Sequence, residues 1–141
     1  MARSALLATL LVALALASPA AAAAPNYILV SGPGLKRPVL MANWDENGAL
    51  MSALVTAPTV SRTVARGLAR RPRLLVSEFW GWGGLPRPTR PRDANQHGWF
   101  YPAHRGQPAI INVTVYGAMV PRLAIPRILA IFARHGIPTR L

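Results

Sequence analysis

The spacing of hydrophobic and polar residues changes several times along this chain, and each change predicts a new element of secondary structure. Residues 27–31 form a short β-rich run that the turn sequence Gly32-Pro33-Gly34 ends, and residues 38–41 form a second such run. Short runs on either side of a glycine-proline turn are typical of paired strands. The start of the pattern therefore predicts a hairpin-like pair of strands.

Further strands are predicted in the second half of the chain. Residues 74–80 are the best strand candidate, and another strand is expected to start at Trp99. Residues 109–116 are a near-continuous run rich in β-branched side chains, which pack well on a pleated surface. Such a run favours a strand in the centre of a sheet.

A first helix is predicted to follow the hairpin. Asn43 or Asp45 carries a short polar side chain that suits a helix N-cap. The apolar positions then recur with helical spacing as far as Leu54. The buried face of this helix is expected to contain Leu50, Met51, Leu54 and Val55.

A second helix is predicted to begin at Thr59 or Ser61 and to continue to Arg71, where Pro72 stops it. Apolar side chains recur every four residues on one face, and arginines recur with the same spacing on the neighbouring face. The apolar positions are Val60, Val64 and Leu68. The arginines form a cationic stripe of Arg62, Arg66 and Arg70.

A third helix is predicted to begin at Pro121 or, in the favoured interpretation, at Pro126, because proline fits a first helical turn. Gly136 suits its C-terminal cap. The apolar stripe expected to face the sheet consists of Ile125, Ile128, Leu129 and Phe132. The order of elements predicts an α+β fold, with a small antiparallel sheet of about four to five strands and two or three helices packed on one face.

The N-terminal residues have the pattern of a secretory signal peptide. Arg3 precedes a largely apolar run over 5–17, Pro19 follows that run, and alanines fill positions 20–24. A positive start, an apolar segment and small residues at the end are the three parts that export requires. The alternative is an uncleaved leader that serves as a single-pass membrane anchor.

The signal peptide is predicted to span residues 1–22, with cleavage near Ala22 or Ala23. The remaining residues, 23–141, are enough for one exported domain with one core, either secreted or periplasmic. The chain has no cysteine. This excludes disulfides, a thiol nucleophile and a cysteine-ligated zinc site, so the fold depends on apolar packing.

The charge of the chain is strongly unbalanced. Lys and Arg total 16 against 4 Asp and Glu, which gives a formal net charge of +12. This excess predicts attraction to an anionic polymer, a glycan or lipid headgroups. Lys36 is the one lysine. The preference for arginine fits bidentate recognition of phosphate or carboxylate, or equally a compositional bias that also favours Ala, Gly and Pro.

An exposed loop rich in proline and arginine is predicted over residues 83–98, and aromatic side chains flank it. Aromatic rings beside guanidinium groups suit stacking on bases or sugars with phosphate pairing. The alternative is that the rings belong to the core and that the arginines keep the loop solvated. The candidate anion-binding residues are Arg87, Arg90 and Arg92, together with the stripe Arg62, Arg66 and Arg70. The aromatic surface candidates are Trp80, Trp82 and Trp99.

Few side chains suit catalysis. Glu78 lies in an apolar strand and is the best candidate for a functional ionisable group, although the favoured interpretation turns it outward to pair with an arginine. Asp93, His97 and His104 are close in sequence and could share a metal or form an acid–base pair, but solvated turn residues are favoured. No nucleophile elbow, phosphate loop or dinucleotide motif is present. We therefore predict no catalytic residue, no metal and no cofactor.

Three short segments carry a resemblance. The sequence from Val30 to Leu35, then Trp99-Phe100-Tyr101-Pro102, then Gln107-Pro108-Ala109-Ile110 resembles small exported bacterial proteins of unassigned function. The resemblance implies secretion and a compact α+β domain. It implies no activity and no site.

Three functions follow in order of preference. The first is a non-enzymatic exported binding or interaction protein. The second is a cationic protein that binds a polyanion or a membrane surface, which requires the arginines to share one face. The third is a small secreted hydrolase using Glu78 or His97, which requires a cleft that brings Glu78 within reach of a histidine.

Overall fold

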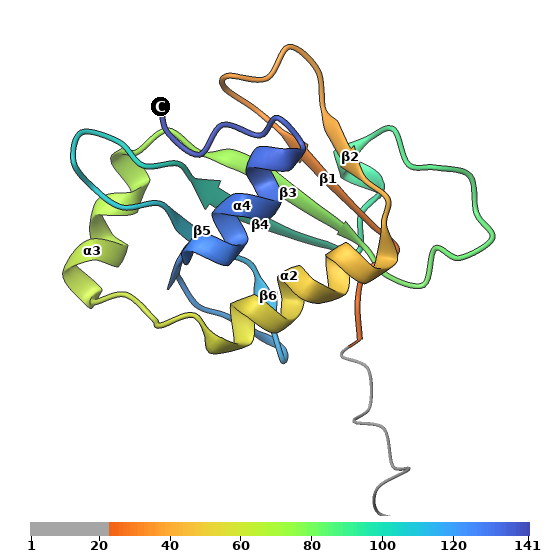
Figure 1. Cartoon of the computed structure of the whole chain (residues 1–141), viewed down its shortest axis with the longest axis horizontal. Helices are drawn as coiled ribbons and strands as arrows, with labels where there is room; N and C mark the ends of the chain where they lie inside the picture. Colours follow the sequence, from red (N-terminus) through yellow and green to blue (C-terminus); the bar gives the residue numbers. More distant parts are fainter. Residues whose placement is uncertain (1–22) are drawn as a thin grey trace, which may run out of the picture.

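The computed structural model describes residues 23–141, and Figure 1 shows a twisted sheet with two helices lying across one face. The predicted signal peptide and the alternative membrane anchor fall in residues 1–22, outside the described part of the chain. Within residues 23–141, no helix is both long and apolar enough to cross a membrane.

The main sheet has six antiparallel strands in the order β2-β1-β3-β4-β5-β8, and β6 and β7 form a separate pair. The predicted α+β class is confirmed, but the sheet exceeds the predicted four to five strands. The additional strand β8 has only two residues, too few to show an alternating pattern. The strands are β1 (Tyr27–Ser31), β2 (Val39–Met41), β3 (Leu74–Phe79), β4 (Gln96–Tyr101), β5 (Ile110–Asn112), β6 (Thr114–Val115), β7 (Ala118–Met119) and β8 (Arg122–Leu123).

Two of the predicted helices form where the capping residues place them. Helix α2 (Trp44–Thr56) begins after Asn43, whose side chain accepts a 3.0 Å hydrogen bond from the backbone N–H of Glu46. Helix α4 (Pro126–Arg134) begins at the favoured proline. Gly136 follows with φ of 72°, the left-handed conformation that ends many helices.

Helices α2 and α4 cover the same face of the sheet, and the main core lies beneath them (Figure 1). Phe132 of α4 meets Phe100 of β4 edge to face, with ring centroids 4.7 Å apart. Ile128 is fully buried with them, while Ile125 and Leu129 are partly buried. The predicted apolar stripe of the last helix therefore faces the sheet.

The predicted second helix is shorter than expected. Helix α3 (Arg62–Gly67) is capped by Ser61, whose hydroxyl accepts from the N–H of Val64 at 3.3 Å. After Gly67 the chain tightens into a 3₁₀ turn, η1 (Leu68–Arg70). Glycine is a poor residue for continuing an α-helix. The prediction of one regular helix to Arg71 is therefore wrong.

The α3–η1 segment contacts the opposite face of the sheet from α2 and α4. Leu68 forms a small second core with Tyr101 and Ile110, and Val60 packs against it. Val64, by contrast, is 41% exposed. Leu68 is the one fully buried member of the predicted stripe Val60, Val64 and Leu68, so the stripe is only partly buried.

The predicted central strand over 109–116 forms only in part: β5 pairs with β4 and β8 inside the main sheet, but it ends at Asn112. The chain leaves the main sheet after β5, and β6 pairs with β7 instead. Gly98 of β4 lies directly opposite this break. A Cβ atom there would come within 2.5 Å of the Asn112 carbonyl oxygen and 2.7 Å of Val113 Cγ1. The close approach that glycine permits lets the chain bend away from the sheet.

The loop rich in proline and arginine is exposed over most of its length, but it ends earlier than the predicted residue 98. Strand β4 already begins at Gln96, and a 3₁₀ turn, η2 (Pro91–Asp93), precedes it. Pro88 is buried. The loop is therefore partly packed against the domain.

An ionic cluster joins α2 to the end of α4, and we call it the Glu46 clamp. The Glu46 carboxylate accepts from Arg134 at 2.9 Å and also binds the His135 ring. Burial acts to raise the pKa of Glu46, but hydrogen bonds and charge from His135 and Arg134 outweigh it and lower the pKa. Arg134 and His135 lie at the C-terminal end of α4, where positive charge suits the helix dipole; their carboxylate partner comes from α2 and is a tertiary contact.

Candidate ligand-binding pocket

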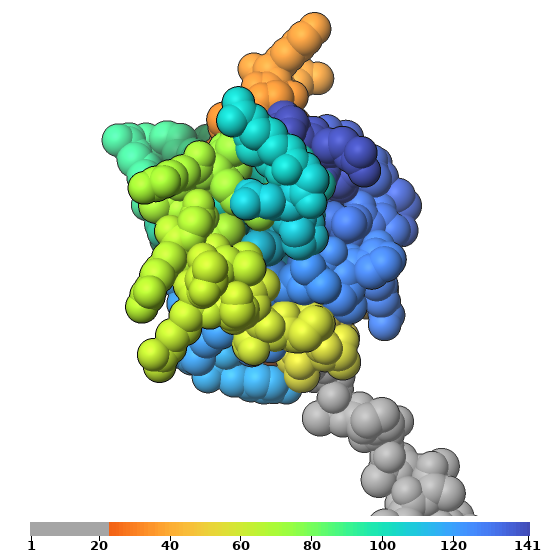
Figure 2. All heavy atoms as spheres, turned by 90° about the vertical axis from the view of Figure 1, so that its left-hand side faces the viewer, coloured from red at the N-terminus to blue at the C-terminus, as the bar shows by residue number. Residues whose placement is uncertain are grey.

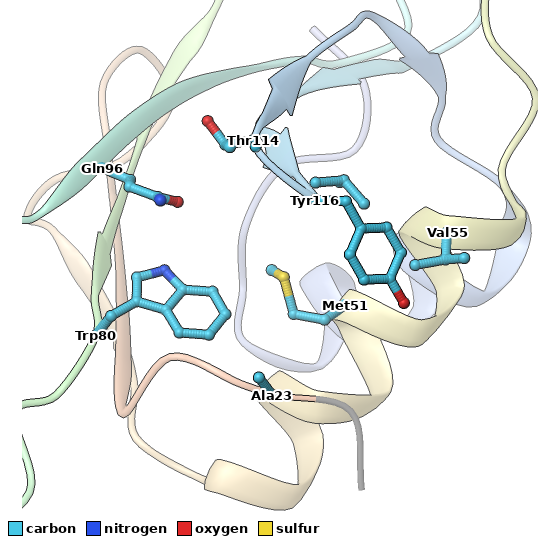
Figure 3. Close-up of a pocket in the computed structure, with 9 residues that line it drawn as sticks. Ala23, Met51, Val55, Trp80, Gln96, Thr114 and Tyr116 are labelled. Carbon is cyan, nitrogen blue, oxygen red and sulfur yellow. The ribbon is translucent and has the colours of Figure 1, made fainter. Parts of the chain in front are cut away.

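A cavity of about 280 Å³ lies between α2, the end of β3 and the β6–β7 hairpin. Figure 3 shows its lining side chains converging from these separate elements. We call it the Trp80 pocket. It is lined by Ala23, Met51, Val55, Trp80, Gln96, Thr114, Val115, Tyr116 and Gly117.

The N-terminal edge of the pocket is fixed by a buried asparagine. Asn47 of α2 is fully buried, and its amide donates to the carbonyl oxygens of Pro25 at 3.2 Å and Met41 at 3.3 Å. These bonds hold the segment before β1 against α2. Ala23 is thereby placed at the pocket (Figure 3).

Two hydrogen bonds hold Trp80 in the pocket wall. Its backbone N–H donates to Asn95 Oδ1 at 2.6 Å, and its indole Nε1 donates to Glu78 Oε2 at 3.0 Å. Asn95 is itself fixed, because its N–H donates to the Glu78 carbonyl at 3.0 Å. Both the backbone and the ring of Trp80 are therefore oriented before any ligand binds.

Glu78 is buried rather than outward-facing, so the favoured sequence interpretation is wrong. Strand alternation puts it on the face of Val76 and Leu74, and its exposure is 1%. Its Oε1 atom has no hydrogen-bond partner within the described residues. Burial raises the pKa of Glu78, and the bond from Trp80 opposes this increase only in part.

The opposite wall of the pocket contains a strained turn. Val115 pairs with Ala118, so Tyr116 and Gly117 form a two-residue hairpin loop. Both have positive φ, 49° for Tyr116 and 74° for Gly117. Such turns favour asparagine, aspartate or glycine at the first position. A tyrosine there is unusual, and this one is 88% exposed.

The pocket is apolar along most of its wall and polar at one end. Figure 3 shows Gln96 and Thr114 together at that end, while Trp80, Met51 and the Tyr116 ring line the rest. None of its lining residues is ionisable at neutral pH. The arrangement suits binding of a molecule that has both an apolar and a polar part.

The three aromatic surface candidates do not form one platform. Trp80 lines the pocket, whereas Trp82 packs edge to face on Phe79 with ring centroids 5.0 Å apart. The face of Trp99 is covered by the Arg73 guanidinium, 3.7 Å from the ring centroid. Of the three predicted stacking surfaces, only Trp80 lines the pocket.

The predicted anion-binding arginines fall into two separate groups, and all are exposed. Figure 2 looks onto α3, where long side chains project from the surface beside the turn at residues 103–108. No carboxylate from residues 23–141 pairs with the stripe Arg62, Arg66 and Arg70. In the loop group of Arg87, Arg90 and Arg92, Arg90 pairs with Asp93 at 3.0 Å.

A buried arginine that the sequence did not single out holds the α3 end in place. Arg71 is 9% exposed and donates to the carbonyl oxygens of Pro102 at 2.6 Å and Pro108 at 2.9 Å. Burial lowers its pKa. Arg71 thus connects η1 to the two chain segments that flank the 103–108 turn.

The remaining catalytic candidates lie apart. His97 Nε2 contacts the Pro91 carbonyl oxygen and His104 Nδ1 contacts the Leu141 oxygen, each at 2.8 Å. Asp93 pairs with Arg90. Neither histidine is hydrogen-bonded to Glu78, and within residues 23–141 no group of three or more potential metal ligands occurs. The geometry that the hydrolase hypothesis requires is not found in this part of the chain.

Comparison with known proteins adds no relative: the chain matches no protein-family model, no curated protein and no solved structure. The pocket therefore has to be interpreted from its own geometry. Trp80 and Glu78 were predicted as separate candidates, whereas Gln96, Thr114 and Tyr116 were not predicted. The Tyr-Gly pair at 116–117 was the available signal, since a glycine after a β-branched run marks a turn.

Proposed function

We propose that this protein is a non-enzymatic exported binding domain whose ligand site is the Trp80 pocket. The observation that carries the proposal is the bond from the Trp80 indole to Glu78, a carboxyl that is almost fully buried and has no ionic partner among residues 23–141. Burying such a group opposes folding. A site that retains it to orient an aromatic wall is a strong functional candidate.

The strained turn at Tyr116 supports the same site. An exposed aromatic side chain in a left-handed conformation adds nothing evident to stability, yet it lines the pocket mouth. Backbone strain of this kind clusters at functional sites. Two independent departures from ordinary sequence–structure preference thus meet at one cavity.

The test is a ligand screen of the purified protein, observed by NMR amide shifts and by tryptophan fluorescence. Binders are expected to shift the amides of Trp80, Gln96 and Tyr116. Trp80→Ala should weaken these binders at least about tenfold, since it removes a large part of the apolar contact. Trp82→Ala is the matched control, because Trp82 packs on the other face of the sheet against Phe79. Binders that shift amides elsewhere would contradict the proposal.

Export is a separate part of the proposal and rests on the leader sequence. Cleavage after Ala22 or Ala23 would retain Pro25, whose carbonyl accepts from Asn47. Mass spectrometry of the exported protein should find an N-terminus at Ala23 or Ala24. An intact N-terminus on membrane-bound protein would favour the anchor instead.

A second candidate function is binding of an anionic polymer to the α3 surface. The observation that favours it is the exposure of Arg62, Arg66 and Arg70 without carboxylate partners in the described chain. Replacing all three with glutamine should weaken heparin binding and flatten its salt dependence. The matched control replaces Arg87, Arg90 and Arg92, of which Arg90 is already paired. Equal effects of the two triple variants would indicate attraction by net charge alone.

A further inference from the structure

We infer that the ligand of the Trp80 pocket is an uncharged amphipathic molecule with a compact apolar body and one hydrogen-bonding head group. This inference rests on the proposed function and adds the chemical class of the ligand. It rests on the size of the cavity, the distribution of its polar side chains and the lack of charged side chains in its lining over residues 23–141.

The cavity limits the size of the body. An apolar protein cavity of about 150 Å³ binds one benzene molecule. The Trp80 pocket, at about 280 Å³, is nearly twice as large. A fused pair of aromatic rings or an aliphatic body of similar volume would therefore fill it. A single ring would leave a part of the apolar wall in contact with water.

The walls determine where that body lies. Trp80 and the Tyr116 ring stand on opposite sides of the space in Figure 3, and Met51 lies between them. Flat rings pack well against aromatic faces. A methionine adapts to the outline of the ligand, because its side chain is unbranched and polarizable. This end of the pocket supplies mainly apolar contact area, and the Trp80 indole N–H is already bonded to Glu78.

The opposite end supplies the polar contacts. Gln96 and Thr114 come from β4 and β6 and lie together there (Figure 3). An amide and a hydroxyl can each donate and accept hydrogen bonds. A head group that also does both, such as a carboxamide, matches this pair. Pure hydrocarbon would leave two polar side chains without partners when water is displaced.

The lining also argues against a charged head group. Among residues 23–141 no lining side chain is charged, and Ala23, where cleavage would create an ammonium group, lies at the end of the pocket away from Gln96 and Thr114 (Figure 3). A carboxylate or an ammonium head bound by Gln96 and Thr114 would therefore lose hydration without gaining an ionic partner. Glu78 does not line the pocket. Its carboxyl lies behind the Trp80 indole, to which it is hydrogen-bonded, and so offers no partner to a cationic head group. The uncharged head is the one that this lining accommodates.

The test compares four naphthalene probes that share one body: the 2-carboxamide, the 2-carboxylate, the 2-methylammonium and 2-methylnaphthalene. Affinity for the purified protein is measured by NMR titration. The carboxamide is expected to bind about tenfold more tightly than either charged probe and severalfold more tightly than the hydrocarbon. Benzamide should bind more weakly than the naphthalene carboxamide.

Two variants test the assignment of the head group. Gln96→Leu and Thr114→Val should each reduce carboxamide affinity severalfold while leaving 2-methylnaphthalene affinity unchanged. Gln107→Leu, in the exposed turn at residues 103–108, is the matched control. A charged probe that binds as tightly as the carboxamide, or carboxamide binding that Gln96→Leu leaves unchanged, would overturn the inference but keep the proposed function. Failure of all four probes to shift pocket amides would overturn both.

Discussion

Helix α2 contacts two regions in which a glutamate has opposite surroundings. At its first turn Glu46 binds Arg134 and His135, and its pKa is lowered. At the pocket, which Met51 of the same helix lines, Glu78 is buried with one indole N–H as its partner, and its pKa is raised. The Glu46 clamp joins two helices, whereas Glu78 orients a wall. The contrast separates a region that favours stability from one that favours binding.

The largest expected effect is on the stable region. Phe132→Ala removes the fully buried ring of α4 that packs on Phe100, in the helix whose end carries Arg134 and His135 of the Glu46 clamp. We expect the free energy of unfolding to fall by about 3–5 kcal/mol, as for other buried phenylalanines. Urea denaturation measures the change. If Trp80→Phe in the pocket lowered stability by as much, the division between the two regions would be incorrect.

The next prediction concerns Glu78 itself. Because burial raises its pKa, the folded protein holds this proton more tightly than the unfolded chain. Its ionised form therefore opposes folding, and stability declines as the pH rises from the ordinary carboxyl value of 4.5 through the higher folded value. Glu78→Gln keeps an acceptor for Trp80 without the charge. It should raise the free energy of unfolding at pH 8 by about 1 kcal/mol and flatten its pH dependence.

Sequence patterns identified the elements more reliably than the site. Asn43, Pro126 and Gly136 act within a few residues of the chain, so local chemistry sufficed to place helix ends. The break after β5 depends on Gly98, which lies opposite on another strand. The β-propensity of residues 109–116 alone therefore predicted a single strand that continues past Asn112, where β5 ends.

The pocket was not predictable for the same reason. Trp80, Gln96 and Thr114 come from distant parts of the sequence and meet only because of sheet order and the departure of β6. Strand alternation and the abundance of arginine favoured a Glu78 side chain on the outward face. That prediction is wrong because residue 78 lies on the face of β3 that the helices cover.

Glu46→Gln should lower the free energy of unfolding, whereas Glu78→Gln should raise it. Glu46→Gln removes the charge that Arg134 and His135 hold. A carboxyl with a lowered pKa contributes stability above its ordinary value of 4.5, and this is lost as the pH falls through the folded value. We expect a loss of at most about 1 kcal/mol at pH 7, because the clamp is partly exposed. A gain on thermal melting would remove the contrast with Glu78.

The smallest expected effect sharpens the comparison most. Tyr116→Asn places a residue that tolerates the left-handed conformation at the first position of the hairpin loop. It should raise the free energy of unfolding by about 0.5 kcal/mol. The same change removes an aromatic wall of the pocket, so affinity for the naphthalene carboxamide should fall severalfold. A gain in stability together with a loss of binding is expected where a residue is retained for function at the expense of folding.

The control for Tyr116→Asn is Arg105→Asn, because Arg105 is exposed and also has a left-handed backbone conformation. Tyr27→Asn is unsuitable as a control, because Tyr27 pairs within the sheet. Arg105→Asn should raise stability by a similar amount and leave carboxamide binding unchanged. Equal binding by the Tyr116 and Arg105 variants would show that Tyr116 is an ordinary turn residue.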